Sequence, residues 1–291
     1  MSDSPYIVHQ PFVYHLGPLE VGGFGLAMLL CFVIGQILLT RELTRRGYDP
    51  APVGDLVFAA VVGGLLGAKI YYAILVQDMD ALFDRAGFVF WGGLIGGIIA
   101  TSLVVRFKKL RWSTISDASA VSLAAAYSVG RTGCWAVGDD YGRPWDSPLA
   151  VQFPEGAPPS TAANMSQLFG TSFPAGTDPS AVIAVHPTQI YEVILGFVMF
   201  LIVWRFRDHK HAAGWLFGLY AVLAGLERFV IEFVRAKDDR FFGPFTVAQL
   251  TSVLLIAIGI ALVAMWRRGG TVEPGPYLSS RAPEERKKKA A

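Results

Sequence analysis

The sequence predicts an all-α membrane protein with about seven transmembrane helices. Of its 291 residues, 53% are hydrophobic and only 16% are charged, whereas soluble domains carry about 25% charged residues. Its 31 glycines suit helices that pack closely in lipid. The net charge of +2 gives no reason to expect a nucleic acid as a partner.

Seven segments are long and apolar enough, or nearly so, to cross a hydrocarbon core, which takes about 20 residues. They are residues 21–39, 54–76, 88–105, 115–129, 189–204, 214–234 and 245–266, of which the fourth and fifth are the shortest. Residues 1–20 contain no Lys or Arg, and no small-residue cleavage site follows the first segment. We therefore expect that segment to be a permanent anchor and not a cleaved signal peptide.

The distribution of Lys and Arg predicts the orientation of the chain. The connections after the first, third and fifth segments and the C-terminal tail hold 17 basic residues, against 6 in the N-terminal segment and the remaining connections. Because basic residues gather on the cytoplasmic side, we expect the N-terminus outside and the C-terminus inside. The connection after the sixth segment is the exception, since it is basic and yet falls on the outer side.

Residues 1–268 are predicted to form one transmembrane domain, with two distinct segments attached to it. Residues 131–188 are rich in Gly, Pro, Ser and Thr but also contain aromatic side chains, which favours a small folded extracytoplasmic cap, because connections of this length are usually functional or disordered. Residues 269–291 combine Pro, Gly and charge without periodicity and are expected to be a disordered, basic cytoplasmic tail.

The first candidate for a functional site is residues 130–143, GRTGCWAVGDDYGR, at the outer end of the fourth segment. Arg131 leaves an apolar stretch, where a charge is costly, and Asp139 follows it. Gly133 and Gly142 allow the backbone to bend and to approach a ligand. The alternative is an interfacial arginine that reaches toward lipid head groups in front of a glycine-rich turn.

The second candidate lies in the sixth segment. Arg228 and Glu232 are four residues apart and share a helix face with Arg235. Three ionisable groups in one apolar helix are expected to face an interior cavity, and the surplus of arginine suits a phosphate, which guanidinium groups bind bidentately. The alternative is a buried ion pair that only fixes helix packing.

The third candidate is residues 186–192, HPTQIYE, at the outer start of the fifth segment. His186, Gln189 and Tyr191 make a polar end to an apolar helix, with a helix cap and an interfacial tyrosine as the alternative. Lys69 is a lone charge inside the second segment, and we expect it to contribute to binding of the lipid head group. Asp117, at the start of the fourth segment, suits the dipole of its own helix.

Together the three motifs predict one positively charged pocket in the outer leaflet, for which a phospholipid head group is the natural ligand. The two cysteines, Cys31 and Cys134, are far apart and no metal-ligand spacing occurs. We therefore expect no metal, no cofactor and no structural disulfide.

At these residues the sequence resembles the prolipoprotein diacylglyceryl transferase family. The family signature Gly-Arg-x-Gly-Asn-Phe-x-Asn-x-Glu-x-x-Gly is matched at Gly130, Arg131, Gly133 and Gly142. Residues 186–192 resemble its His-Pro-Ser-Gln-x-Tyr-Glu stretch, and residues 228–235 its Arg-Phe-x-x-Glu-Phe-x-Arg helix. Residues 92–96 (GGLIG) and 16–19 (LGPL) resemble its glycine-rich third span and its Gly-Pro lead into the first span.

Five positions depart from the family pattern. Cys134 and Val137 replace two signature Asn residues, and Asp139 replaces the signature Glu. Trp91 stands where the family has His before its paired glycines, and Phe24 where it has Tyr in the first span.

The resemblance implies an enzyme of the bacterial inner membrane, whose partners are membrane lipid, phosphatidylglycerol and the signal peptides of preprolipoproteins. It implies that Arg131 and Arg228 hold the lipid phosphate while a cysteine thiol attacks the glyceryl carbon. His186 is the first candidate base, Asp139 the second, and Glu232 orients Arg228. The alternatives are a non-catalytic lipid-binding paralogue on the same scaffold and a related transferase with another acceptor. A transporter is disfavoured because no inverted repeat is visible.

Overall fold

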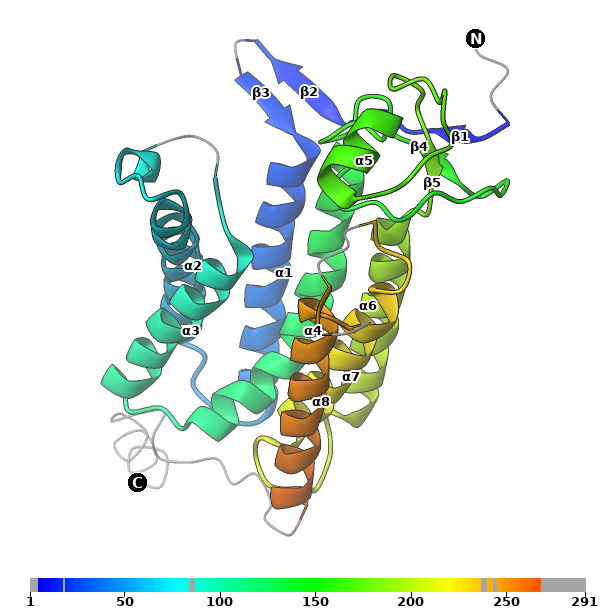
Figure 1. Ribbon diagram of the computed structural model, residues 1–291. Coiled ribbons are helices and arrows are strands. Elements are labelled where there is room, and N and C mark those ends of the chain that lie inside the picture. Colours follow the sequence, from blue (N-terminus) through cyan, green and yellow to red (C-terminus); the bar gives the residue numbers. More distant parts are fainter. Residues whose placement is uncertain (1–4, 18, 84–86, 237–239, 243–244, 268–291) are drawn as a thin grey trace, which may run out of the picture.

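The computed structural model describes residues 5–17, 19–83, 87–236, 240–242 and 245–267, so the predicted tail lies outside the described residues. The helical class is confirmed, and each predicted apolar segment corresponds to a long helix (Figure 1). These helices are α1 (Gly23–Arg45), α2 (Val53–Val76), α3 (Phe90–Phe107), α4 (Trp112–Val137), α6 (Thr188–Phe206), α7 (Trp215–Ile231) and α8 (Val247–Met265).

The chain is a multi-pass membrane protein. Five helices in the described part of the chain, α1, α2, α3, α6 and α8, are long and apolar enough to cross a membrane. Their large apolar side chains point outward: Phe58 of α2 is 69% exposed and Leu254 of α8 is 60% exposed. Such exposure suits side chains whose solvent is lipid. Helix α7 is shorter, with 17 residues.

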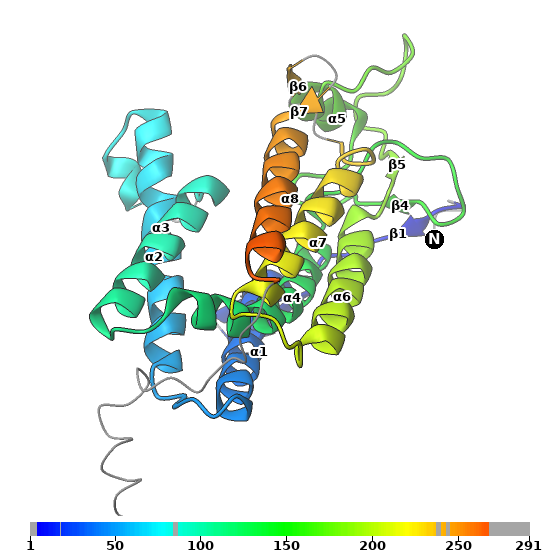
Figure 2. The same ribbon diagram turned by 90° about the horizontal axis from the view of Figure 1, so that it is seen from below.

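Helix α4 is the central helix, which explains why it is less apolar than the others. Its residues Ala118, Ala120, Val121 and Ala124 are fully buried. It packs against α1, α6 and α7, while α8 packs on α7 (Figure 2). Because other helices cover α4, its surface carries small residues that allow close packing, and large lipid-facing side chains are not required.

Helices α2 and α3 form a pair that packs through glycines, as the sequence predicted. Gly67 faces Gly92 and Gly63 faces Gly96, and a Cβ atom at any of these positions would collide with the backbone of the opposite helix. The glycine-rich segment at the start of α3 is therefore a packing surface between helices.

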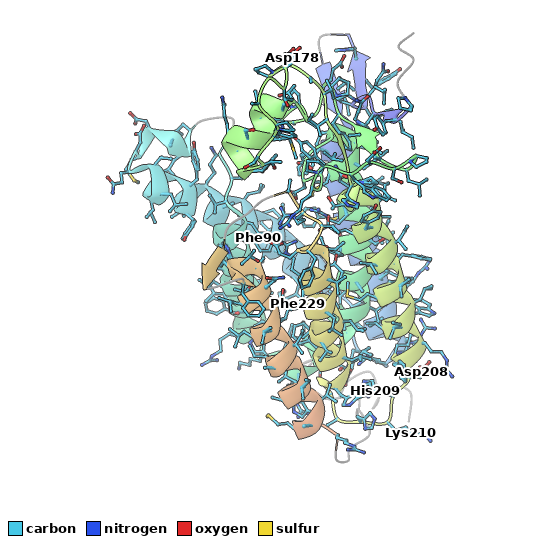
Figure 3. All side chains as sticks on the ribbon, turned by 45° about the vertical axis from the view of Figure 1, so that its right-hand side comes forward. Phe90, Asp178, Asp208, His209, Lys210 and Phe229 are labelled. Carbon is cyan, nitrogen blue, oxygen red and sulfur yellow. The ribbon has the colours of Figure 1, made fainter. Side chains whose placement is uncertain are left out.

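An ionic cluster joins the helices at the end opposite the predicted site, near Asp208, His209 and Lys210 in Figure 3. Asp117 of α4 is fully buried, forms an ion pair with Arg46 at 2.6 Å and is within hydrogen-bond distance, 2.9 Å, of Nε2 of His209. Its Oδ1 accepts hydrogen bonds from the backbone N–H groups of Gly214 and Leu216. Asp117 thus caps the N-terminus of α7. Its charge complements the dipole of α7, whereas the sequence had indicated the dipole of its own helix, α4.

The segment between α4 and α6, residues 138–187, is called the cap here. It contains helix α5 (Ala162–Phe169) and strands β4 (Val151–Gln152) and β5 (Ala184–Val185). Strand β1 (Ile7–Val8), from the N-terminal segment, pairs in parallel with β4, which pairs antiparallel with β5. Buried Tyr141, Phe153 and Met165 form its core. The aromatic residues that predicted a folded segment therefore pack together.

Short strands outside the cap were not predicted. Strands β2 (Val13–Leu16) and β3 (Leu19–Gly22) form a hairpin directly before α1, and β6 (Arg240–Phe242) pairs with β7 (Phe245–Thr246) before α8. A single-turn 3₁₀-helix, η1 (Asp80–Leu82), lies between α2 and α3. These elements are too short to give a recognisable sequence period.

Three predicted segments end away from the ends of their helices, and the first of them is α1, which continues to Arg45 where an end at residue 39 was expected. The fourth helix was expected to end at residue 129, but α4 continues to Val137 and stops at Gly138, whose φ is 68°. A left-handed glycine is a common helix terminator, and the earlier glycines are tolerated within the helix. The sixth helix was expected to reach residue 234, but α7 ends at Ile231, so Arg235 lies beyond it.

Candidate active site

Arg131 lies inside α4, less than two turns before the helix ends at the cap. Its guanidinium group forms an ion pair with Glu192 of α6 and a second one, at 3.1 Å, with Asp140 of the cap. It also donates to the sulfur of Cys134 at 3.2 Å. Arg131 is therefore an interior residue with several partners, and the alternative of a lipid-facing interfacial arginine does not hold.

The arginines of α7 and of the segment after it join the same network. Arg228 pairs with Glu232, and Arg235 lies 3.6 Å from Glu232 and 2.8 Å from Asp140. A continuous series of ion pairs thus runs from Arg228 to Arg131. The predicted convergence of the fourth and sixth segments is present in the structure.

The backbone beside Arg235 is held by the cap. Gly142 and Arg235 form an antiparallel bridge, and the N–H of Gly142 donates to the carbonyl of His186 at 2.8 Å. The start of α6 fixes the preceding turn, because Thr188 and Gln189 donate to the carbonyls of Asp140 and Asp139. Three segments distant in sequence therefore set the position of Asp140.

The predicted surplus of positive charge is not present in the resting site. Each of the three arginines in the network is paired with a carboxylate of Asp140, Glu192 or Glu232. Burial alone would raise the pKa of Asp140, but the guanidinium groups of Arg235 and Arg131 outweigh it and hold that pKa below its usual range. An anionic ligand must therefore compete with carboxylates for the arginines.

Asp139 is the least compensated acid of the site. Burial, and after it the neighbouring Asp140, raises the pKa of Asp139 to about 6. Its Oδ1 is buried without a hydrogen-bond partner in the described part of the chain, as are Nε of Arg131, Oε1 of Gln189 and Oε1 of Glu232. Buried polar groups are normally satisfied, so these four atoms are available to a ligand or to water.

His186 and Tyr191 lie at the rim of the site. The ring of His186 stacks on Trp145, with centroids 4.3 Å apart, and its Nδ1 is 3.3 Å from the hydroxyl of Tyr191. Burial lowers the pKa of His186. Gly133 is buried against α1, where its Cβ would lie 3.0 Å from that of Ala27, so it serves helix packing.

Lys69 lies on α2 and Trp91 on α3, the two helices that pack through glycines. The Nζ of Lys69 donates to the carbonyl of Ala81 at 3.2 Å and lies over the ring of Phe88. Lys69 therefore ties α2 to the α2–α3 connection, and its prediction as a head-group ligand is not supported. Trp91 is 40% exposed on α3.

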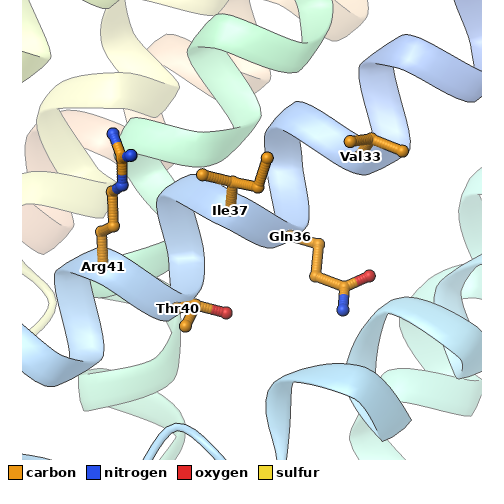
Figure 4. A pocket seen from close by; sticks show the side chains of 5 residues that line it. All are labelled: Val33, Gln36, Ile37, Thr40 and Arg41. Atoms are coloured by element: carbon orange, nitrogen blue, oxygen red, sulfur yellow. The ribbon is translucent and has the colours of Figure 1, made fainter.

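A shallow cavity lies elsewhere, along α1 (Figure 4). It has a volume of about 380 Å³ and is lined by Val33, Gln36, Ile37, Thr40 and Arg41. None of these lining residues belongs to the arginine network.

Sequence reasoning placed Asp140 and Glu192 within the candidate motifs but gave neither of them a role in the site. Glu192 carried a usable signal, because an acid one turn inside an apolar helix is costly unless it is paired. Asp140 carried none apart from its neighbour Asp139. Cys134, Asp139 and Asp140 lie close enough to resemble a metal-ligand set, with donor atoms within 4.8 Å of one another, but Arg131 and Arg235 already neutralise Asp140.

These features define a multi-pass membrane protein with a buried arginine–carboxylate network between its central helices and a folded cap. The chain belongs to the prolipoprotein diacylglyceryl transferase family, whose model matches residues 11–265.

Curated relatives of the chain share the name phosphatidylglycerol–prolipoprotein diacylglyceryl transferase. The protein from Xanthomonas oryzae pv. oryzae (strain PXO99A) is 32% identical over 281 residues, which cover 91% of this chain and 94% of the relative. That from Stenotrophomonas maltophilia (strain R551-3) is 32% identical with the same coverage. That from Clostridium tetani (strain Massachusetts / E88) is 30% identical over 260 residues, 86% of this chain and 95% of the relative.

Proposed function

We propose that this chain transfers the diacylglyceryl group of phosphatidylglycerol to the cysteine thiol of preprolipoproteins. Membership of the family and the shared name of the relatives support this activity. The observation that carries it is the single ion-pair network that joins Arg131, Arg228 and Arg235. Guanidinium groups gathered in this way suit a phosphate, and the leaving group of the reaction, glycerol phosphate, carries that phosphate.

In this proposal the lipid phosphate replaces Asp140 as a partner of Arg131 and is also bound by Arg228, which keeps its pair with Glu232. Asp140 is the exchangeable partner, because its side chain is 38% exposed, whereas those of Glu192 and Glu232 are almost fully buried. Its φ of 56° is a left-handed conformation that aspartate tolerates better than most residues. Arg235 then holds the displaced Asp140 or contributes a third charge.

The reaction forms one bond and breaks one. The thiol loses its proton to a base, and the sulfur attacks the glyceryl carbon that carries the phosphate ester. The carbon–oxygen bond breaks, a thioether forms, and glycerol phosphate leaves with the bonding electron pair. The arginines stabilise the charge that develops on the departing phosphate. A base is needed because a free thiol has a pKa near 8.5.

Asp139 is the base that we favour. Its pKa of about 6 leaves it ionised at neutral pH yet more basic than an ordinary aspartate. It lies within 4.8 Å of Cys134, the neighbour of Arg131. His186 is the second candidate: the lowered pKa of its ring keeps it neutral and able to accept a proton, but it lies at the rim and stacks on Trp145.

The proposed setting is the bacterial inner membrane, with all seven long helices spanning it, the N-terminus outside and the C-terminus in the cytoplasm. The loop basicity supports this orientation. It places the cap, residues 138–187, outside the cytoplasm and the arginine network in the outer leaflet. The basic tail then faces anionic lipid on the inner surface.

Arg131→Ala tests the proposal. The purified variant and the wild-type protein are compared for release of glycerol phosphate from phosphatidylglycerol in the presence of a lipobox peptide. The same genes are expressed in cells depleted of their own transferase, and lipoprotein maturation is scored. We expect the wild type to be active and the variant to insert normally but to lose transfer. Normal transfer by the variant would overturn the assignment.

The non-catalytic paralogue is the second candidate, and Trp91, in place of the family histidine, is the observation that favours it. A lipid-binding paralogue binds phosphatidylglycerol through the same arginines but releases no glycerol phosphate. Binding by the wild type without thiol-dependent release would therefore select this alternative.

A further inference from the structure

A tyrosine between two buried glutamates lies directly beneath Arg131. Tyr127 is one helical turn before Arg131 on α4. Its hydroxyl is 3.0 Å from Oε1 of Glu227 on α7 and 3.5 Å from Oε1 of Glu192 on α6. Glu227 is 8% exposed and Glu192 only 2%. The catalytic network described above makes no use of Tyr127 or Glu227.

The hydroxyl of Tyr127 has one proton to donate and so cannot satisfy both carboxylates at once. The shorter contact indicates that it donates to Glu227 in the resting protein. Glu192 is held instead by Arg131, through its other oxygen. Glu227 forms no ion pair with any residue in the described part of the chain, so the hydroxyl is its direct polar partner.

Binding of a phosphate to Arg131 disturbs this arrangement. The guanidinium group exchanges Asp140 for the phosphate, and its contact with Glu192 weakens as it turns toward the new partner. A buried carboxylate that loses its partner costs more than the hydrogen bond itself, because it keeps the full penalty of desolvation. A new donor to Glu192 is required for tight binding, and the hydroxyl of Tyr127 is already within 3.5 Å.

We propose that Tyr127 is a positioning residue that redirects its hydroxyl from Glu227 to Glu192 when a phospholipid phosphate engages Arg131. Glu227 then takes up one proton from solvent and uses it to donate a hydrogen bond to the oxygen of Tyr127. Glu192, Tyr127 and Glu227 then each have a hydrogen-bond partner. This inference rests on the proposed function only because it takes the phosphate of phosphatidylglycerol as the ligand of Arg131.

The proposal predicts different effects at the two positions. Tyr127→Phe removes the donor that Glu192 needs in the bound state and leaves a buried carboxylate without that hydrogen bond. The dissociation constant for phosphatidylglycerol is therefore expected to rise about tenfold. Glu227→Gln offers an amide N–H to the tyrosine oxygen without taking up a proton, so the constant is expected to fall or stay unchanged.

A double-mutant cycle separates this role from simple packing. Short-chain phosphatidylglycerol is titrated into the purified full-length protein in detergent, and melting temperatures are recorded for every variant. With Glu192→Gln the charge that needs the donor is gone, so adding Tyr127→Phe is expected to change the constant less than twofold. Tyr220→Phe is the matched control, since Tyr220 is a partly buried tyrosine two helical turns before Glu227 on α7, and it is expected to leave binding unchanged.

A dissociation constant for Tyr127→Phe within twofold of the wild type would overturn the proposal. A tenfold rise on adding Tyr127→Phe to both the wild-type protein and the Glu192→Gln variant would overturn it as well. If Tyr127→Phe does not fold, a weaker affinity in Glu227→Gln would overturn it equally. Transfer by the wild type is measured in the same samples. Absence of transfer contradicts the proposed function, while the binding cycle still decides the role of Tyr127.

Discussion

Asp140 bridges two arginines that lie about 100 residues apart: its Oδ2 is 3.1 Å from Arg131 and its Oδ1 is 2.8 Å from Arg235. One carboxylate thereby joins the end of α4 to the segment after α7. The bridge occupies the guanidinium groups in the resting protein and is exposed enough to be exchanged. A phosphate that replaces Asp140 at Arg131 meets a guanidinium group that Glu192 already positions, and Glu232 positions Arg228, the second guanidinium group of the proposed site.

Arg131→Lys should retain the charge but lose most of the activity. A lysine presents a point charge and cannot contact Glu192, Asp140 and a phosphate through one planar group. Each lost charge-assisted hydrogen bond corresponds to about 1.5–3 kcal/mol, so we expect kcat/KM to fall about 10- to 100-fold. Steady-state kinetics with phosphatidylglycerol and a lipobox peptide measure this. Activity close to that of the wild type would show that charge alone suffices.

The pH profile of transfer should reveal Asp139. Because burial raises its pKa to about 6, the proton-accepting form accumulates as pH rises through 6, and kcat/KM should increase there and then level off. Asp139→Asn should lower the plateau and remove this limb of the profile, whereas His186→Gln should leave the limb in place. A limb that persists in Asp139→Asn but disappears in His186→Gln would reverse the two assignments.

Gly142→Ala should disrupt the site without removing a charge. A Cβ atom at Gly142 would lie 2.5 Å from the carbonyl oxygen of Val234 and 2.6 Å from Cβ of His186. Overpacking of this kind costs about 1–3 kcal/mol. We expect a lower melting temperature and at least tenfold weaker transfer.

Gly54→Ala is the control for this substitution. Gly54 lies in α2, and its Cβ would meet no atom within 4 Å. Alanine is favoured over glycine in a helix by about 1 kcal/mol, so Gly54→Ala should not lower stability. Equal losses of transfer in both variants would mean that the contacts of Gly142 are unimportant.

Trp91→Ala should have little effect on transfer. Trp91 replaces the histidine of the family pattern, but it is 40% exposed and lies on α3, whose main packing partner among the described residues is α2. We expect kcat/KM within threefold of the wild type. A loss of a hundredfold or more would indicate that α3 contributes to the site once substrate is bound.

Much of the fold follows from the sequence, because a membrane requires long apolar helices and their lengths are set by the bilayer. The motifs of Arg131, His186 and Arg228 were likewise recognisable as charged or polar groups in apolar surroundings. The ends of α4 and α7 were predicted less well. Glycines at 130 and 133 indicated a bend, whereas close packing against α1 keeps the helix regular up to Gly138.

The charge balance of the site could not be predicted from the sequence. The sequence argument gave a positive surplus because Asp140 and Glu192, although they lie in the candidate motifs, were not recognised as ion-pair partners of Arg131. The contacts of Lys69 could not be predicted from the sequence either. A lone lysine in an apolar helix can find a backbone carbonyl and an aromatic ring at its own end of the molecule, as Lys69 does with Ala81 and Phe88.

An experimental structure of the full-length protein with phosphatidylglycerol bound tests the central claim most directly. The account predicts one phosphate with oxygens about 2.8 Å from guanidinium nitrogens of both Arg131 and Arg228, and Asp140 displaced from Arg131. A phosphate that contacts neither arginine while their carboxylate pairs stay intact, for instance one bound at Arg41 in the cavity along α1, would contradict it.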